Sequence, residues 1–272
     1  MRFMCTSLVV MVLSAGQVCL AAPAPDQAIS VRVAAYNVEF GKSTTPEQVG
    51  EMFQPYNLDI IGFNEVPDGD WTARVGTVLG MEYSYVGKIS SANHKDKYKS
   101  ILSRTPLKGT TEHELTHTKR RRGWNPASVV RAVTELDGIS IAFYSLHICK
   151  SGKDDGHAYQ LATEILPKEK TERVIAVGDF NNNIGDEAMN TIEAAGMKPT
   201  WKDLTIDLST QFTYNALNPD KNLGVIDHIF YNHASSGAKT VDSGIIELEE
   251  PLSDHKPIWA QIVFPRDLEV VK

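Results

Sequence analysis

Short apolar runs that end in polar residues recur along this chain, and they constrain its fold more than any other feature. Their small and β-branched side chains predict strands over the following ranges: 31–38, 58–65, 100–103, 128–136, 139–146, 173–177, 224–230 and 258–263. Helices are expected between some of these strands, over residues 71–79, 158–166 and 186–195 and from Thr45-Pro46-Glu47 onward. Because helices alternate with strands in some parts and strands follow strands in others, the order predicts a layered α/β or α+β sandwich.

The composition excludes several other classes of protein. A hydrophobic fraction of 42% excludes a disordered chain, 19 glycines exclude a collagen-like repeat, and 3 cysteines exclude a disulfide scaffold. The 272 residues contain no repeat, low-complexity tract or evident linker. One domain that spans residues 25–272 is therefore the simplest expectation.

The first 24 residues are typical of a secretory signal peptide. Arg2 precedes an apolar stretch over residues 7–15, and small residues follow, with cleavage expected near Ala22 or Ala24. The stretch is too short to span a bilayer core of roughly 30 Å. We therefore expect a secreted or periplasmic protein without a stable membrane anchor, with a lipoprotein at Cys19 or a retained anchor as the alternatives.

Removal of this segment leaves Cys149 as the single cysteine, so no internal disulfide is expected. Cys149 follows His147 by two residues, and a cysteine–histidine nucleophile pair is conceivable. No third orienting group stands out in the sequence, so a small buried residue is the preferred interpretation of Cys149.

The charge is unevenly distributed. The chain carries a net charge of −7, yet residues 88–122 contain ten basic and three acidic residues. Within this segment Arg120 and Arg121 could grip a nucleic-acid backbone or a phosphorylated head group, and Arg131, further on, could reach a phosphate. A solvated loop and strand face is an equally good interpretation of the same charges.

Polar residues capable of catalysis gather at the ends of the expected strands. They are Asn37, Glu65, His147, Asp179, Asn181, Asp227, Asp254 and His255. Strand ends are where open sheets bind ligands, and a carboxylate there is costly unless it is paired or metal-bound. We therefore expect one shared site. Strand alternation places His228 on the face opposite Asp227, which favours a structural role for His228.

One motif suggests a different chemistry. His113-Glu114-Leu115-Thr116-His117 matches the zinc-hydrolase pattern, which requires a helix. The flanking glycine and threonines favour a strand or turn, in which the two histidines would lie roughly 13 Å apart. Both could not reach one zinc ion at about 2 Å, so this interpretation is rejected.

Six short motifs occur in a specific order and carry a family resemblance. They are Tyr36-Asn37-Val38-Glu39, Phe63-Asn64-Glu65-Val66, Ser145-Leu146-His147, Gly178-Asp179-Phe180-Asn181, Ile226-Asp227-His228-Ile229-Phe230 and Ser253-Asp254-His255-Lys256-Pro257. In this order the chain resembles the endonuclease/exonuclease/phosphatase superfamily of deoxyribonuclease I-like, metal-dependent phosphoesterases. The resemblance implies a four-layer sandwich of two mixed β-sheets flanked by helices.

The resemblance also implies a role for each residue. Glu65, Asn37 and Asp254 would hold the metal, Mg²⁺ or Mn²⁺, and oxygen ligands suit both ions. The catalytic residues would be His147, Asp179, Asn181, Asp227 and His255. In this scheme Asp179 orients the attacking water, and Asp227 holds His255.

We therefore expect an exported, divalent-metal-dependent hydrolase of phosphodiester bonds, with a nuclease among the candidates. The partner is a phosphate-ester substrate, with nucleic acid as one option, and the sequence predicts no oligomeric state. A phosphomonoesterase or a sphingomyelinase- or phospholipase C-like hydrolase is the first alternative. A non-catalytic binding protein on the same scaffold is the second.

Overall fold

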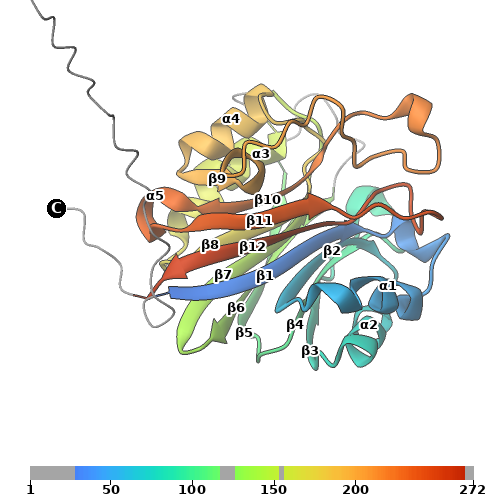
Figure 1. Ribbon diagram of the computed structural model, residues 1–272, viewed down its shortest axis with the longest axis horizontal. Helices are drawn as coiled ribbons and strands as arrows, with labels where there is room; N and C mark the ends of the chain where they lie inside the picture. Colours follow the sequence, from blue (N-terminus) through green and yellow to red (C-terminus); the bar gives the residue numbers. More distant parts are fainter. Residues whose placement is uncertain (1–27, 117–125, 153–155, 267–272) are drawn as a thin grey trace, which may run out of the picture.

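Two six-stranded β-sheets pack face to face between two layers of helices (Figure 1). The computed structural model describes residues 28–116, 126–152 and 156–266. The first sheet has the strand order β11 (Lys239–Ile245), β12 (Ile258–Pro265), β1 (Ala28–Asn37), β2 (Ile60–Val66), β4 (Tyr98–Ser103) and β3 (Tyr83–Val86). The second has the order β5 (Lys108–Leu115), β6 (Ala127–Leu136), β7 (Ile139–His147), β8 (Val174–Asp179), β10 (Asp227–Asn232) and β9 (Met197–Pro199). The expected four-layer α/β sandwich is confirmed.

The helices cover the outer faces of the two sheets. Helices α1 (Pro46–Phe53) and α2 (Trp71–Leu79) pack on the first sheet. Helices α3 (Gly156–Gln160) and α4 (Glu187–Ala194) pack on the second, where α3 continues into the π-helical turn η6 (Leu161–Ile165) and the 3₁₀ turn η7 (Leu166–Lys168). The short helix α5 (His233–Ser236) follows β10. Among the described residues, no helix is long and apolar enough to span a bilayer.

Short 3₁₀ turns fill several of the connections. They are η2 (Glu39–Gly41), η3 (Gln54–Tyr56), η4 (Ser91–Asn93), η8 (Thr200–Lys202) and η9 (Pro219–Lys221). The expected start of α1 is confirmed, since Thr45 and Gln48 form a reciprocal capping box around Pro46. A tight hairpin joins β6 to β7 at Asp137 and Gly138, which both have the positive φ that this type of turn requires.

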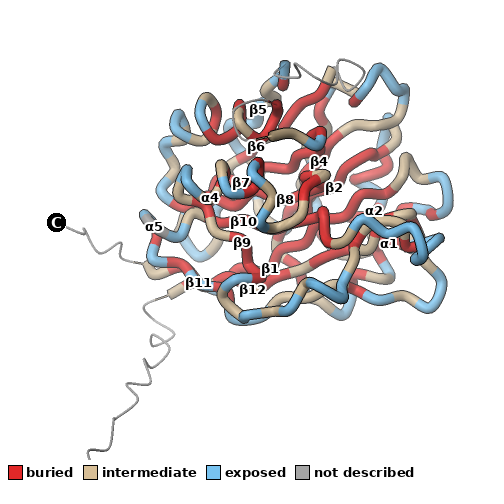
Figure 2. Tube along the Cα trace, turned by 90° about the horizontal axis from the view of Figure 1, so that it is seen from above, coloured by how far each residue is buried: buried red, intermediate tan, exposed pale blue. Residues whose placement is uncertain are grey.

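Alternation along the strands divides the core into three layers. Val33 and Ala35 of β1 face the second sheet, where they meet Ile175 and Val177 of β8, whereas the intervening Ala34 faces α1 and α2. Buried positions are concentrated in the central strands of both sheets (Figure 2). This packing fixes which face of each strand points into the space between the sheets.

The strands that position the site end at one edge of the sandwich. Parallel pairing of β7 with β8 aligns His147 with Asp179, and antiparallel pairing of β8 with β10 aligns Asp179 with Asp227. In the first sheet, parallel pairing of β1 with β2 aligns Asn37 with Asn64. The polar residues at these strand ends, which lie far apart in the sequence, are therefore close together in the structure.

Candidate active site

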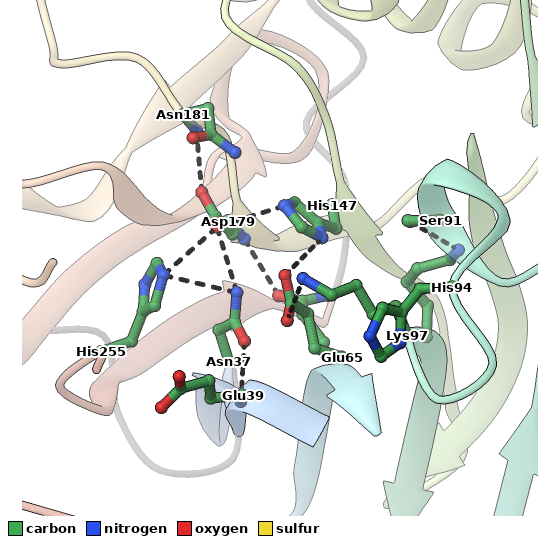
Figure 3. A network of polar contacts seen from close by, with 12 residues as sticks. Asn37, Glu39, Glu65, Ser91, His94, Lys97, His147, Asp179, Asn181 and His255 are labelled. Atoms are coloured by element: carbon green, nitrogen blue, oxygen red, sulfur yellow. Dashed lines mark hydrogen bonds and ion pairs between the residues drawn. The ribbon is translucent and has the colours of Figure 1, made fainter. Parts of the chain in front are cut away.

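Asp179 is the centre of a buried polar network between the two sheets (Figure 3). Its Oδ2 accepts a hydrogen bond from Asn37 Nδ2 at 3.1 Å and lies 3.4 Å from His147 Nε2 and 3.6 Å from His255 Nε2. Its Oδ1 accepts the backbone N–H of Asn181 at 2.9 Å. The structure thus brings together five of the residues that the sequence predicted, from segments far apart in the chain.

The backbone before Asp179 is shaped for close contact with β7. Gly178 has φ +141°, and a Cβ atom there would lie 1.9 Å from the carbonyl oxygen of Leu146, so glycine is required. The Asp179 N–H donates to Asn64 Oδ1 at 3.0 Å, which ties β8 to β2 of the other sheet. Sequence reasoning gave Asn64 no role, although it lies directly before Glu65.

Glu65 reaches the site through a strained bulge. Its neighbours Ile61 and Phe63 face α1 and α2, so strict alternation would turn Glu65 away from the space between the sheets. The pairing of β2 with β4 shifts register between Asn64 and Val66, and Glu65 takes φ +52°. Non-glycine residues rarely adopt this conformation, and such strain clusters at functional sites. Asn181 shares it, with φ +51°.

His147 lies between the two carboxylates. Its Nδ1 is 3.6 Å from Glu65 Oε1, and its Nε2 is the atom that faces Asp179. Burial and the nearby ammonium groups of Lys99 and Lys97 hold the pKa of His147 well below its usual range. The ring is therefore neutral at physiological pH, and it can donate one hydrogen bond without adding charge.

His255 has the opposite electrostatic state. Its Nδ1 lies 2.8 Å from Asp227 Oδ2, and the edge of its ring packs against Tyr214 with ring centroids 5.0 Å apart. Burial disfavours the charged ring, but Asp227 and Asp179 outweigh it and raise the pKa of His255 to about 10. The Asp227 carboxylate thus holds His255, the contact that the sequence resemblance implied, and its negative charge favours the protonated ring.

The buried position of Asp179 among other acidic groups raises its pKa. Burial raises the pKa of Asp179 to about 8, with His255 working against the shift and Asp227 and Glu65 adding to it. Asp227 is 1% exposed, and its Oδ1 has no hydrogen-bond partner. A buried, unsatisfied carboxylate oxygen in an acidic cluster indicates a place for a positive charge.

The donor set suits a hard divalent cation. Among the described residues, ligand atoms of Asp179, Asp227 and His255 lie within 4.8 Å of one another. His255 is a poor ligand while it is protonated, because a metal requires a neutral imidazole. The Glu65 carboxylate and the amide of Asn37 add further oxygen atoms, and carboxylate and amide oxygens suit Mg²⁺ and Mn²⁺.

Asp254, the third predicted metal ligand, lies beside this group. Its Oδ1 is 3.3 Å from Ser253 Oγ, and it does not belong to the three converging side chains found among the described residues. Burial raises its pKa; His255 opposes this effect, whereas Glu39 and Glu65 reinforce it. Asp254 therefore belongs to the acidic surroundings of Glu65.

The expectation for Arg131 is corrected. Val130 and Ala132 face the space between the sheets, so Arg131 points to the opposite face of β6, toward the helices. There its guanidinium forms two 2.9 Å hydrogen bonds with Glu169 and one of 2.8 Å with the Gly109 carbonyl. Arg131 is thus held away from the Asp179 network. Arg120 and Arg121 lie outside the described residues.

Other expectations are confirmed. His113 lies in strand β5, as its flanking residues predicted, and His117 is outside the described residues. His228 is fully buried between Trp201 Nε1 at 3.2 Å and the Asn182 carbonyl at 2.8 Å, a structural position. Cys149 is buried, as expected of a small core residue.

Two lysines of the basic segment lie beside the site. Lys97 Nζ lies 2.8 Å from Glu65 Oε2. Lys99 is fully buried, and its Nζ donates to the Ile89 carbonyl at 2.7 Å. Both belong to the basic segment noted in the sequence, but charge density alone does not tell which lysine points into a site.

The fold and this site define a class of phosphate-ester hydrolases. The sequence model of the Endonuclease/Exonuclease/phosphatase family matches residues 34–255, which is more than half of the chain. The chain belongs to this family, and its fold is that of a family phosphoesterase. A search of curated proteins finds no match.

Solved structures of the same fold come from several organisms. A family protein from Bacteroides vulgatus has a TM-score of 0.69 at 19% identity, covering 89% of this chain and 100% of its own. A mannosyl-6-phosphatase from Bacteroides thetaiotaomicron has 0.63 at 18%, covering 85% and 99%. TDP2 from D. rerio, complexed with a single-strand DNA product, has 0.64 at 15%, covering 86% and 98%. At these identities the likeness concerns the fold.

Proposed function

We propose that this protein is an exported, divalent-metal-dependent phosphoesterase that hydrolyses phosphodiester bonds. The observation that carries the proposal is the network around Asp179, in which one buried carboxylate contacts Asn37, His147 and His255 between the two sheets. A buried carboxylate with a raised pKa, in contact with two histidines, favours a catalytic role over a non-catalytic scaffold. Such groups are costly and cluster at catalytic sites.

Glu65, together with Asn37 and Asp254, is our proposed ligand set for Mg²⁺ or Mn²⁺. When bound, such an ion neutralises charge on the phosphate and on the developing transition state. The converging side chains of Asp179, Asp227 and His255 form the alternative position for the ion.

The chain's own residues supply the rest of the chemistry. Water attacks phosphorus, and Asp179, in its ionised form, accepts one of the water protons. The bond to the leaving oxygen breaks, and that oxygen takes up a proton from solvent water and leaves as an alcohol. The imidazolium of His255 and the neutral ring of His147 stabilise charge on the phosphate oxygens, so no covalent intermediate is needed.

Hydrolysis of bis(p-nitrophenyl) phosphate by the purified chain tests this proposal. We expect turnover with Mg²⁺ or Mn²⁺ and its loss in EDTA, followed by recovery when the ion is restored. Absence of turnover with either ion would support the non-catalytic alternative. Turnover that persists in EDTA would contradict metal dependence.

A phosphomonoesterase is the second candidate, because one structure of the same fold is a mannosyl-6-phosphatase. A nuclease is favoured by the basic segment and by the fold it shares with the DNA complex of TDP2. A panel of single-stranded DNA, RNA, a sugar phosphate and sphingomyelin separates these options. The largest kcat/KM identifies the substrate class.

Export is tested on the N-terminus. Expression of the full chain in a secreting bacterial host should yield a periplasmic or secreted protein that begins after Ala22 or Ala24. Intact-mass measurement decides this, and a mature protein that keeps Met1 in the cytoplasm would contradict the proposal.

A further inference from the structure

We propose that Lys97 is a substrate-contact residue that pairs with Glu65 in the metal-free protein and turns to the substrate phosphate when Glu65 takes a divalent cation. The inference rests on the proposed function. It adds a group for which none of the six sequence motifs accounts. Three features of the structure carry it.

The first feature is the position of the ammonium group. Lys97 Nζ lies 2.8 Å from Glu65 Oε2, and both side chains point toward the Asp179 network (Figure 3). The Glu65 side chain is 9% exposed and that of Lys97 24%, so Lys97 reaches in from the mouth of the site. A divalent cation on Glu65 must displace this ammonium, which then stays beside the site without an anion.

The second feature is the rigid support of the Lys97 backbone. Its N–H donates to Ser90 Oγ at 3.0 Å, and its carbonyl accepts the Ser91 N–H at 3.1 Å. Lys99 is fully buried, and its Nζ donates a hydrogen bond to Ser91 Oγ at 3.2 Å. The segment that carries Lys97 is thus fastened to the sheet, and its presence beside the site does not depend on substrate.

The third feature is the aromatic ring beside the ammonium group. Lys97 Nζ lies 5.5 Å from the centroid of the Phe40 ring, and the His94 ring packs at a tilt against the same ring at 5.0 Å. The ammonium thus has an aromatic neighbour besides Glu65, and no second carboxylate of the described residues holds it in the ion pair that the structure shows. A lysine ammonium offers three donors on a flexible stem, which suits a phosphate that arrives after the metal.

A matched pair of variants tests the proposal. Lys97→Met removes the ammonium and keeps the stem, whereas Lys95→Met removes the same charge from an exposed position on the same segment. Manganese affinity is measured by electron paramagnetic resonance, and the affinity for inorganic phosphate in saturating Mn²⁺ by calorimetry. KM for bis(p-nitrophenyl) phosphate is the third readout.

Lys97→Met should bind Mn²⁺ as tightly as the wild type or more tightly, because the competitor for Glu65 is gone. Phosphate affinity should fall about tenfold, as expected for loss of one charge-assisted hydrogen bond, and KM should rise by a similar factor. Lys97→Arg should recover most of the phosphate affinity. Lys95→Met should match the wild type in all three measurements.

Unchanged phosphate affinity in Lys97→Met would overturn the proposal. So would weakened Mn²⁺ binding in a variant that melts like the wild type, since Lys97 would then merely support Glu65. A wild type that binds Mn²⁺ and phosphate but hydrolyses no ester would contradict the proposed function alone. The two binding measurements would still decide the role of Lys97.

Discussion

Two buried charge clusters lie on opposite faces of the second sheet, and they differ in how well their carboxylates are satisfied. On the helix side, Glu169 accepts hydrogen bonds from Arg131, Tyr144 and the Thr171 N–H. Burial disfavours ionisation of Glu169, but these partners outweigh it and lower its pKa to about 2. Between the sheets, burial raises the pKa of Asp179 to about 8.

The comparison separates a structural cluster from a functional one. Glu169 has a matched cation and enough donors, so its charge stabilises the fold. Asp179 shares one imidazolium with Asp227, whose Oδ1 stays unpaired, and Glu65 adds further negative charge. The fold tolerates this because the strands that carry the cluster are well packed, and a cation or a reaction can use it.

The largest expected effect is on turnover when the functional carboxylate is neutralised. Asp179→Asn keeps the shape but removes the proton acceptor, so we expect less than a tenth of wild-type hydrolysis of bis(p-nitrophenyl) phosphate. The melting temperature should stay the same, and should rise at a pH where the buried carboxylate of the wild type is charged. His255→Ala should lose activity as severely. A folded Asp179→Asn protein above that threshold would contradict the assignment.

The structural cluster should respond in the opposite way. Glu169→Gln leaves the Arg131 guanidinium without its carboxylate, and we expect a loss of about 2 kcal/mol in the free energy of unfolding. Urea denaturation measures this loss. Activity should stay within about twofold of wild type, because the cluster faces the helices. Arg131→Met should likewise leave KM unchanged, and a rise in its KM would restore Arg131 as a phosphate contact.

Addition of a divalent metal ion should stabilise the protein through the cluster around Asp179 and Glu65, and not through the cluster around Glu169. A divalent ion that binds only the folded state, at a concentration of about 100 times its Kd, adds roughly 2.7 kcal/mol to the free energy of unfolding. Thermal melts in Mn²⁺ and in EDTA measure this effect. We expect the shift in the wild type and in Glu169→Gln, and its loss in Glu65→Gln. An equal shift in Glu65→Gln would place the ion elsewhere.

The two clusters should also differ in how they make stability depend on pH. In EDTA, the raised pKa of Asp179 makes its protonated form the stable one, so its contribution declines as pH rises from about 4 toward 8. Glu169 acts in the other direction, and its contribution declines as pH falls from 4.5 toward about 2. Chemical denaturation between pH 4 and 8 should show a flatter profile for Asp179→Asn than for the wild type; parallel profiles would contradict the raised pKa.

Local pattern in the sequence was enough to predict the central strands and the residues at their ends. Buried strands such as β1, β7 and β8 must be apolar on both faces, so they stand out as runs. The edge strands β3, β9 and β11 were missed, because one side of an edge strand is open and its residues need not be apolar. The alternation that placed His228 opposite Asp227 also held.

Only the tertiary structure decided which side chains near those strand ends point into the site. Glu65 enters the site only because a bulge against β4 breaks the alternation that would bury it under α1 and α2. Arg131 was equally free to face either side until the pairing of β6 fixed its register. Lys97 meets Glu65 through a connection whose path depends on distant packing. Spacing along a chain encodes the face of a strand, whereas contact between segments depends on how whole sheets pack together.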